Sequence, residues 1–476
     1  MGFLNSIMFW DLLFLLVFTL SVILFLYKRR KRVVREGIMY LYKTQIGIKI
    51  IDKLAKKNPK FWKTMGYLVI AIGYILMIAM VALLAQFIYI FMQPDLVKII
   101  KIPPLTPLIP YLPSLFKINW LPPFYFTYWI LAIAIIAIVH EGFHGIYARL
   151  HNIKIKSTGF GFLGPFLAFF VEQDDKDMTK RPISQQLSVL GAGVFANILV
   201  GIVFYIIMAL FFFSFFVPSG ALFNAYAISS GPSVALQDAD IGEDVINIQN
   251  INFTQVQVMN KSYFVYQEFL EPDYNFTNQE IIYYYQDQPA IRNKFLGESV
   301  VTQAAVTHID NMPVIGHDAL RSKLGDYNPG DNISIRIRIN GEDKDYNITL
   351  GENYDNPGKP MLGIGYGGER NWKRALYDLV EMNYFKEPST YYGPKDDSKW
   401  VKFVFDLLWW LVLINLSVAL VNMLPVAIFD GGRFFYLTIL GITKKEKIAN
   451  MAFKGITILI LLIIVWLMVL WGFGIR

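Results

Sequence analysis

The chain has 476 residues, of which 55% are hydrophobic and 17% are charged, and its net charge is +7. With a mean hydropathy of +0.41, these values indicate an integral membrane protein with room for two or three domains. There is no cysteine, which excludes disulfides and thiolate ligands, so a metal would need His, Asp or Glu. The basic residues cluster at the flanks of apolar segments; this is a topology signal and gives no support to nucleic-acid binding.

Two apolar segments come first, at residues 7–27 and about 66–92, each long enough to span a bilayer. The first lacks a small-residue cleavage site, so we expect a retained helix. Between Lys28 and Lys63 lie 13 basic and 2 acidic residues, which by the positive-inside rule places this loop in the cytoplasm and the N-terminus outside. Residues 1–123 are therefore a predicted two-helix extension that crosses the membrane.

The third span, about 124–150, carries the motif HEGFH at its inner end. His140 and His144 are four residues apart, so one face of a helix brings both imidazoles to one metal ion. Glu141 would lie beside the metal, where it can take a proton from a water. The ordinary alternative, two histidines at a membrane boundary, leaves a buried Glu141 unexplained. We interpret the histidines as metal ligands and Glu141 as a general base.

Two further segments complete the first half of the membrane core, residues 124–217. The stretch GFGFLGPFLAFFVEQDD, 159–175, is too short to span and contains Pro165, so we expect a re-entrant hairpin, with an interfacial loop as the alternative. The fourth span, 187–217, has a small-residue face at Gly191, Gly193 and Gly201. Its one strongly polar side chain, Asn197, either bonds near the active site or joins two helices.

Residues 218–400 are polar, with 25 acidic and 15 basic side chains and alternating strand patterns. Five Asn-x-Ser/Thr sequons fall here, which agrees with an exterior location. Residues 308–350 predict strand, turn, short helix, turn and hairpin, an order that resembles a PDZ domain. Residues 231–253 resemble the start of such a domain, so the region holds either one interrupted PDZ-like domain or one plus a partial copy. PDZ domains bind peptides by strand addition, which suits a substrate filter.

The last part, residues 401–476, begins with a fifth span that leads into NMLPVAIFDGG. Pro425 must interrupt the helix, and Gly431 and Gly432 allow a sharp turn. Broken backbone at membrane depth is tolerated where it lines a protein site, and Asp430 is the carboxylate there. A sixth span, about 452–473, follows.

A zinc held by two histidines needs a third protein ligand, and three candidates compete. One zinc-binding pattern places a third histidine six residues after the second, at position 150. That residue is Leu150, and His151 falls on the wrong face of the helix. Glu172 lies in a charged turn and is more simply a solvated residue. Asp430 is brought to the same depth by the fifth span, so the topology favours it.

In this order, the HExxH helix, the GxxxN helix, the PDZ-like region and the N-x-x-P-x-x-x-x-D-G-G motif resemble the site-2 protease family of intramembrane zinc metalloproteases. The resemblance implies that His140, His144 and Asp430 bind Zn²⁺ and that Glu141 is the general base. It also implies supporting and substrate-facing residues. The supporting residues are Asn197, Asn422, Pro425 and Gly431, and the candidate substrate-binding residues are Gly159, Phe160, Gly161, Gly164 and Pro165.

The sequence therefore predicts an α-helical polytopic protein of the cell membrane, with about six transmembrane helices, a re-entrant hairpin and an inserted extracytoplasmic α/β PDZ-like domain. Its predicted function is a zinc metalloendopeptidase that cleaves transmembrane segments of single-span membrane proteins near the cytoplasmic side of the bilayer. The PDZ-like domain is expected to contact substrate or peptide outside. A catalytically silent scaffold or chaperone, which binds peptides through that domain, is the alternative. A prenyl-protein processing peptidase would need a glutamate as third ligand, and no intramembrane glutamate follows the motif.

Overall fold

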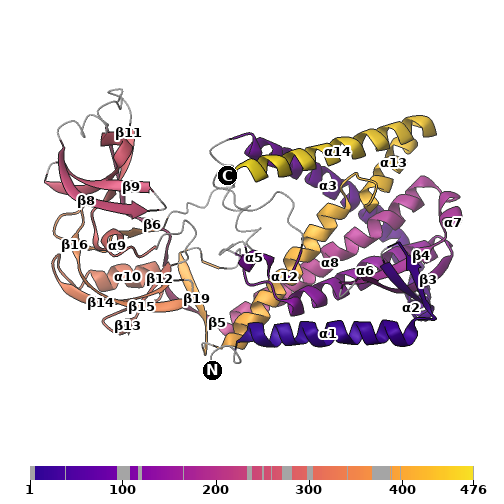
Figure 1. The fold of residues 1–476 in the computed structure, drawn as a ribbon, viewed down its shortest axis with the longest axis horizontal. Helices are drawn as coiled ribbons and strands as arrows, with labels where there is room; N and C mark the ends of the chain where they lie inside the picture. Colours follow the sequence, from indigo (N-terminus) through magenta and orange to yellow (C-terminus); the bar gives the residue numbers. More distant parts are fainter. Residues whose placement is uncertain are drawn as a thin grey trace. The chain divides into compact units, whose positions relative to one another are not determined.

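The computed structural model describes residues 6–37, 39–93, 108–115, 121–163, 166–232, 239–248, 251–258, 260–270, 281–296, 304–339, 341–366, 386–387, 389–396 and 398–474. The chain divides into two compact units (Figure 1). A helical unit contains Met1–Met208 and Phe403–Arg476, and a sheet unit contains Ala209–Lys402.

In the described part of the chain, six helices are long and apolar enough to cross a membrane, which is the predicted number. They are α1 (Ile7–Arg29), α3 (Pro59–Phe91), α6 (Phe126–Leu150), α8 (Ile183–Phe215), α12 (Lys399–Asn422) and α14 (Glu446–Gly474). Helices α3 and α8 begin several residues before the apolar runs that predicted them, since polar first turns continue the same helix. Shorter helices of this unit are α2 (Ile46–Lys57), α5 (Leu112–Leu115), α7 (Asp175–Thr179) and α13 (Asp430–Thr443).

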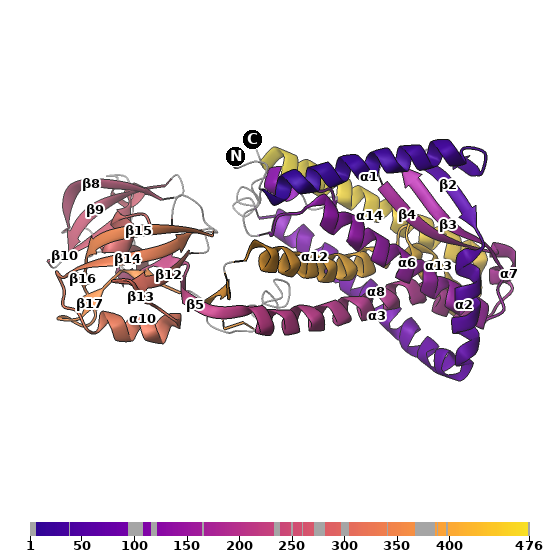
Figure 2. The ribbon, with the colours of Figure 1, turned by 90° about the horizontal axis from the view of Figure 1, so that it is seen from below.

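The core of the helical unit joins α3, α6, α8, α12 and α13 through buried apolar side chains. Tyr147 of α6 is fully buried among them, with Leu190 of α8 and Phe434 of α13 in the same cluster. Figure 2 shows the long helices of this unit from a second direction. This packing holds the HExxH helix α6 against the two elements that carry the rest of the site.

A four-stranded antiparallel sheet with the order β1-β2-β3-β4 also belongs to the helical unit. Its strands are β1 (Val33–Glu36), β2 (Met39–Thr44), β3 (Ile155–Leu163) and β4 (Phe166–Gln173). The segment that we expected to re-enter the membrane is thus a β-hairpin, and its position in a bilayer stays a prediction. Strands β1 and β2 come from the basic loop after α1 and were not predicted.

Among its described residues, the sheet unit contains two larger sheets and two short strand pairs. One sheet has the order β15-β14-β12-β5-β19, with β13 paired to β12; the other has the order β7-β11-β10-β9-β8. The first comprises β5 (Phe216–Phe223), β12 (Ala304–Ile309), β13 (Met312–Pro313), β14 (Asn332–Ile339), β15 (Glu342–Thr349) and β19 (Thr390–Pro394). The second comprises β7 (Ile228–Pro232), β8 (Asp240–Ile248), β9 (Ile251–Val258), β10 (Lys261–Tyr266) and β11 (Ile281–Gln286). The remaining elements are β6 (Ala225–Tyr226), β16 (Gly351–Glu352), β17 (Pro360–Met361), β18 (Ile364–Gly365), the 3₁₀ helix η2 (Gln267–Leu270), α9 (Pro289–Arg292) and α10 (Gly316–Leu324).

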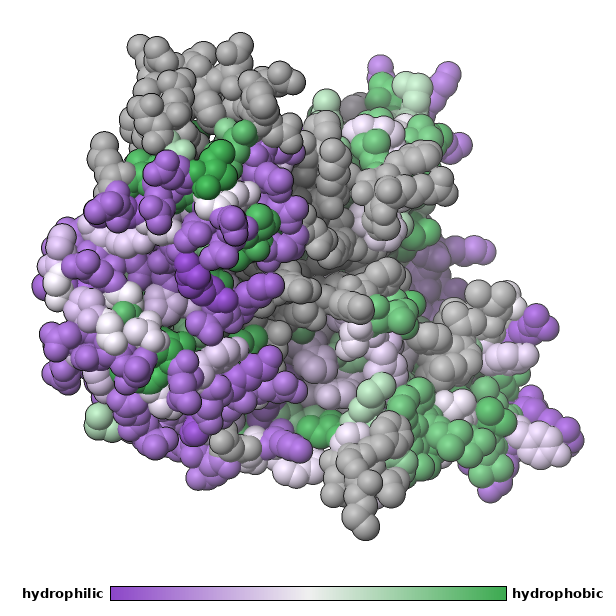
Figure 3. Space-filling view, turned by 60° about the vertical axis from the view of Figure 1, so that its left-hand side comes forward, coloured by the Kyte–Doolittle hydropathy of each residue, from purple (hydrophilic) through white to green (hydrophobic). Residues whose placement is uncertain are grey.

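Residues 308–350 follow the predicted order of strand, turn, short helix and hairpin, since β12, β13, α10, β14 and β15 succeed one another. The segment 231–253 lies elsewhere. Its strands β7, β8 and β9 belong to the second sheet, and β12 instead pairs with β5. The two segments that resembled parts of a PDZ domain therefore do not share a sheet. In Figure 3 the surface of the sheet unit is mostly hydrophilic.

Candidate metal centre

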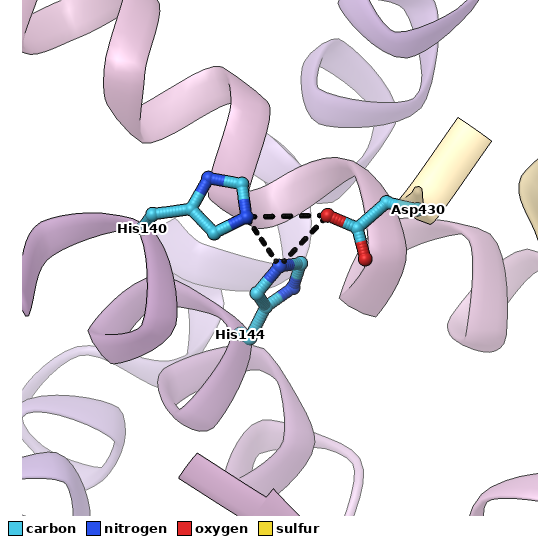
Figure 4. Close-up of side chains that lie close together, drawn as sticks. All are labelled: His140, His144 and Asp430. Carbon is cyan, nitrogen blue, oxygen red and sulfur yellow. Dashed lines mark hydrogen bonds and ion pairs between the residues drawn. The ribbon is translucent and has the colours of Figure 1, made fainter. Parts of the chain in front are cut away.

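Three side chains from two distant parts of the helical unit meet at one point (Figure 4). Oδ2 of Asp430 lies 3.2 Å from Nε2 of His140 and 3.2 Å from Nε2 of His144, and the two Nε2 atoms are 3.0 Å apart. Ligand atoms at about 2.0–2.1 Å from a tetrahedral zinc are separated by roughly 3.3 Å, close to these three distances. The donor set and its spacing fit a zinc ion with three protein ligands.

The hydrogen bonds of His144 show which of its ring nitrogens faces the centre. Nδ1 lies 2.7 Å from the carbonyl oxygen of Val189. Because a carbonyl only accepts, Nδ1 must carry the proton, and the lone pair of Nε2 then points at Asp430. A backbone carbonyl that fixes a histidine in this way is a common partner of a metal ligand.

His140 is oriented by the amide of Asn197, whose Nδ2 lies 3.0 Å from Nδ1 of the imidazole. The Oδ1 atom of Asn197 is buried and has no hydrogen-bond partner among the described residues. If the amide oxygen and nitrogen are exchanged, Oδ1 accepts from a protonated Nδ1 of His140, and Nδ2 takes the buried position that has no partner among the described residues. In that assignment both imidazoles direct the lone pair of Nε2 towards the carboxylate, an arrangement that a bound cation or a proton would stabilise.

One face of α8 builds this wall of the site through residues spaced four apart. Val189 supplies the carbonyl, Asn197 supplies the amide, and Gly193 between them supplies space. A Cβ atom on Gly193 would lie 2.4 Å from Nε2 of His144 and 2.6 Å from Nε2 of His140. The sequence identified Gly193 as part of a packing face; its role beside the imidazoles was missed, although its spacing from Asn197 was a usable signal.

Asp430 reaches the site because the backbone turns between two helices. Helix α12 ends at Asn422, the following turn buries Pro425, and Asp430 lies in the first turn of α13. A Cβ atom on Gly431 would lie 2.3 Å from the carbonyl carbon of Met423, so only glycine allows this close approach. Asn422 is the last residue of α12, and Pro425 lies in the turn that follows it.

Glu141 does not join the three ligands but lies against the sheet. Its Oε2 accepts a hydrogen bond of 3.0 Å from the backbone N–H of Val171 in β4. Strand β4 is the edge of the sheet and packs along α6. The catalytic helix and the hairpin are therefore connected through the predicted general base, a link that sequence reasoning missed because a backbone N–H leaves no pattern.

The candidate substrate-binding residues divide into two sets. Gly159, Phe160 and Gly161 lie in β3, whose backbone pairs with β2 on one side and β4 on the other. Gly164 and Pro165 lie outside the described residues. Strand β3 is therefore paired on both sides, whereas β4 is the edge strand of the sheet.

The two rejected ligand candidates have other partners. Nε2 of His151 lies 2.9 Å from Oγ of Ser188. Glu172 accepts hydrogen bonds from Oγ of Ser157 at 2.6 Å and from Nζ of Lys43 at 3.1 Å. The bonds from Ser157 and Lys43 hold the pKa of Glu172 below its ordinary value. Both residues make structural contacts away from the three ligands.

Comparison with known proteins adds an independent observation. Residues 128–467 match the family model described as Peptidase family M50. A zinc metalloprotease RasP of Shouchella clausii is 23% identical over 188 residues, which is 34% of this chain and 44% of that protein. An uncharacterized protein of Methanocaldococcus jannaschii is 29% identical over 186 residues, 38% of this chain and 46% of that protein. The matched regions thus span less than half the length of these relatives.

Proposed function

We propose that this chain, which belongs to peptidase family M50, is an intramembrane zinc endopeptidase that cleaves the transmembrane segments of single-span membrane proteins. Family membership agrees with the site-2 protease resemblance of the motifs. The observation that carries the proposal is the convergence of His140, His144 and Asp430 within an apolar bundle. Ionisable side chains inside an apolar bundle are costly unless they pair with one another or form a functional site.

His140, His144 and Asp430 would hold the zinc ion. When bound, zinc would supply a Lewis acid that lowers the pKa of a water and polarises the scissile carbonyl. The Val189 carbonyl and the Asn197 amide hold the other ring nitrogens of the two imidazoles and so orient both rings towards this position.

Glu141 is proposed to move the proton. Its carboxylate accepts a hydrogen bond of 3.0 Å from the Val171 N–H, on the side of α6 that faces β4. One of its oxygens is engaged there, and the other can take a proton from the attacking water and deliver it to the leaving amine. The hydrogen bond to Val171 sets the direction from which this carboxylate works.

The edge strand β4 is proposed as the element that holds the substrate. A helix hides its own amides, so a transmembrane substrate must unwind before a peptide bond can react. Because the Val171 N–H points away from β3, strand alternation turns the N–H and C=O groups of Phe169 to the same side. An unwound substrate could pair with this edge and be presented to the metal site.

The sheet unit is proposed to lie outside the cell and to contact substrates before cleavage. The acidic composition and five sequons of its sequence support this location. The strand–helix–hairpin order of β12 to β15 supports a PDZ-like peptide-binding role for this unit. The active site is proposed to lie towards the cytoplasmic side of the membrane.

Zinc content, measured by elemental analysis of the purified full-length protein, tests the ligand set. We expect about one zinc per wild-type chain and a loss of most of it in Asp430→Ala. Glu172→Ala is the matched control, because this carboxylate was the competing candidate and should leave zinc content unchanged. Zinc that persists in Asp430→Ala, or its absence from the wild type, would instead favour a protein that has lost catalysis and binds peptides.

A further inference from the structure

The first helix carries a buried carboxylate that the proposed chemistry does not use. Asp11 of α1 is only 4% exposed, although it lies in a helix long and apolar enough to span a membrane. Its Oδ2 accepts from the N–H of Phe126 at 2.7 Å and from the Tyr111 hydroxyl, and its Oδ1 accepts from the N–H of Thr127 at 2.9 Å and from the Thr127 hydroxyl. Four donors therefore surround one carboxylate.

These donors identify the carboxylate as a cap supplied by another helix. Phe126 and Thr127 are the first residues of α6, and Tyr125 before them makes no side-chain cap of its own. The first N–H groups of a helix lack internal partners and carry partial positive charge, so an anion there is stabilising. Asp11 of α1 meets both needs for α6, the helix of the HExxH motif.

The loop before α6 is shaped to complete this contact. Tyr111 has a φ of +66°, a left-handed conformation that bulky residues rarely adopt, and its backbone N–H bonds to the carbonyl of Phe124 at 2.8 Å. In that conformation its hydroxyl reaches Asp11. The region that matches the family begins at residue 128, so Asp11 and Tyr111 both lie before it.

The extension also holds the opposite end of α6. Asp52 of α2 forms an ion pair of 2.8 Å with Arg149 in the last turn of α6. Gly145 gives α2 room, since a Cβ atom there would lie 2.7 Å from the side chain of Ile51. Contacts near both ends fix how far α6 can slide along its own axis.

We propose that Asp11 is a positioning residue for α6, the helix of the HExxH motif, and that α1 and α2 brace α6 against axial movement. A helix is stiff, so a shift at Phe126 is carried to His140, Glu141 and His144. Catalytic groups need to be held within about 0.5 Å of their working positions, and a displacement of about 1 Å can reduce rate on the order of a hundredfold. This inference rests on the proposed protease function, since it assigns the brace to that site.

The test compares Asp11→Ala with Phe18→Leu in the purified, zinc-loaded full-length protein. Phe18 packs on Phe126 with ring centroids 5.5 Å apart, so its replacement weakens the same α1–α6 contact but keeps the cap. The reporter is a tagged single-span protein whose Leu/Ala transmembrane helix contains a central Asn-Pro pair. We expect Asp11→Ala to lower kcat on the order of tenfold with KM little changed, and Phe18→Leu to lower thermal stability but not kcat.

Conservative variants keep the test decisive if Asp11→Ala does not fold. Asp11→Asn retains an acceptor without the charge and should lose less activity, and Tyr111→Phe should lose least, because it removes one donor. An unchanged kcat in all of these variants, or an equal loss of kcat in Phe18→Leu, would show that Asp11 does not position α6.

A second readout separates this proposal from the proposed function. In cobalt-substituted protein, the visible absorption reports ligand geometry without any cleavage. We expect Asp11→Ala to change this spectrum relative to wild type and Phe18→Leu to leave it unchanged. If the spectrum of Asp11→Ala differs from that of wild type but the wild-type protein cleaves no reporter, the positioning role of Asp11 stands and the protease function is refuted. If the wild-type protein cleaves the reporter but Asp11→Ala has the wild-type spectrum, only the positioning role is refuted.

Discussion

At the scale of single residues, the metal centre depends on empty space as well as on ligands. Gly193 faces both imidazoles, and a methyl group there would overlap their Nε2 atoms. The rings cannot move aside freely, because the Val189 carbonyl and the Asn197 amide hold their other nitrogens. A side chain that intrudes at this position must therefore displace the ligands themselves.

Gly193→Ala is predicted to abolish zinc binding while the protein still folds. Gly142→Ala is its control, since Gly142 lies inside the HEGFH motif and a Cβ atom there would meet nothing within 4 Å. Zinc content of the two purified variants provides the measurement. A fully zinc-loaded Gly193→Ala protein would show that the imidazoles stand elsewhere.

The sequence was sufficient to find the residues whose chemistry is rare in a membrane helix. His140, Glu141, His144 and Asp430 are conspicuous because ionisable side chains in apolar segments call for an explanation. The same rule should have identified Asp11, a carboxylate within the first span, whose partners lie about a hundred residues away along the chain. The roles of Val189 and Val171 were beyond prediction, because they act through backbone atoms whose positions only the fold defines.

At the scale of elements, the apolar helices were predictable and the small sheet was not. A run of apolar residues long enough to cross a bilayer specifies a helix almost by itself. Strands β1 and β2 are short, and basic residues surround them, so their pattern indicated only a cytoplasmic loop. Strand β2 pairs with β3, which is more than a hundred residues away along the chain, and such pairing depends on tertiary structure.

The edge of β4 offers a test of the proposed substrate contact. Phe169→Pro removes an outward-facing N–H, and proline is tolerated on edge strands, so the sheet should remain intact. We predict that KM for the single-span reporter rises several-fold in Phe169→Pro, while Phe169→Ala, which keeps the N–H, stays closer to wild type. Equal KM values in the two variants would argue against strand pairing at this edge.

At the scale of the whole molecule, two units with different surfaces are encoded in one chain. The sheet unit has its own apolar core, formed by residues such as Phe223, Val306 and Ile335. Its polar network includes Asp287, whose side chain is 4% exposed and bonds to Arg292 at 2.5 and 2.6 Å and to Ser262 at 2.7 Å. The segregation of acidic residues predicted this unit, whereas its division into two large sheets followed from pairings between distant strands.

The stability of the sheet unit should decrease in acid through Asp287. Burial raises the pKa of this carboxyl, but the bonds from Arg292 and Ser262 outweigh it and leave the pKa below its ordinary value. Its stabilising effect is therefore complete above the unfolded pKa of about 3.9 and is lost as pH falls through the folded value. Urea unfolding of the full chain should show a smaller loss of stability between about pH 5 and about pH 3 in Asp287→Asn than in wild type.

The same variant should be less stable than wild type at neutral pH, by about 1–3 kcal/mol, because the Arg292 guanidinium loses its ionic acceptor. An identical pH dependence in wild type and Asp287→Asn would show that other carboxyls account for the acid response.

Glu141 is expected to act beside a metal held by His140, His144 and Asp430, and a comparison of two proteins tests this role. Cleavage of the single-span reporter is measured for wild type and Glu141→Gln, both purified with their zinc content determined. We predict equal zinc content and a fall in cleavage rate of at least about a hundredfold in Glu141→Gln, since removal of the base leaves the ligands intact. A zinc-loaded Glu141→Gln protein that cleaves the reporter as fast as wild type would show that Glu141 is not the general base.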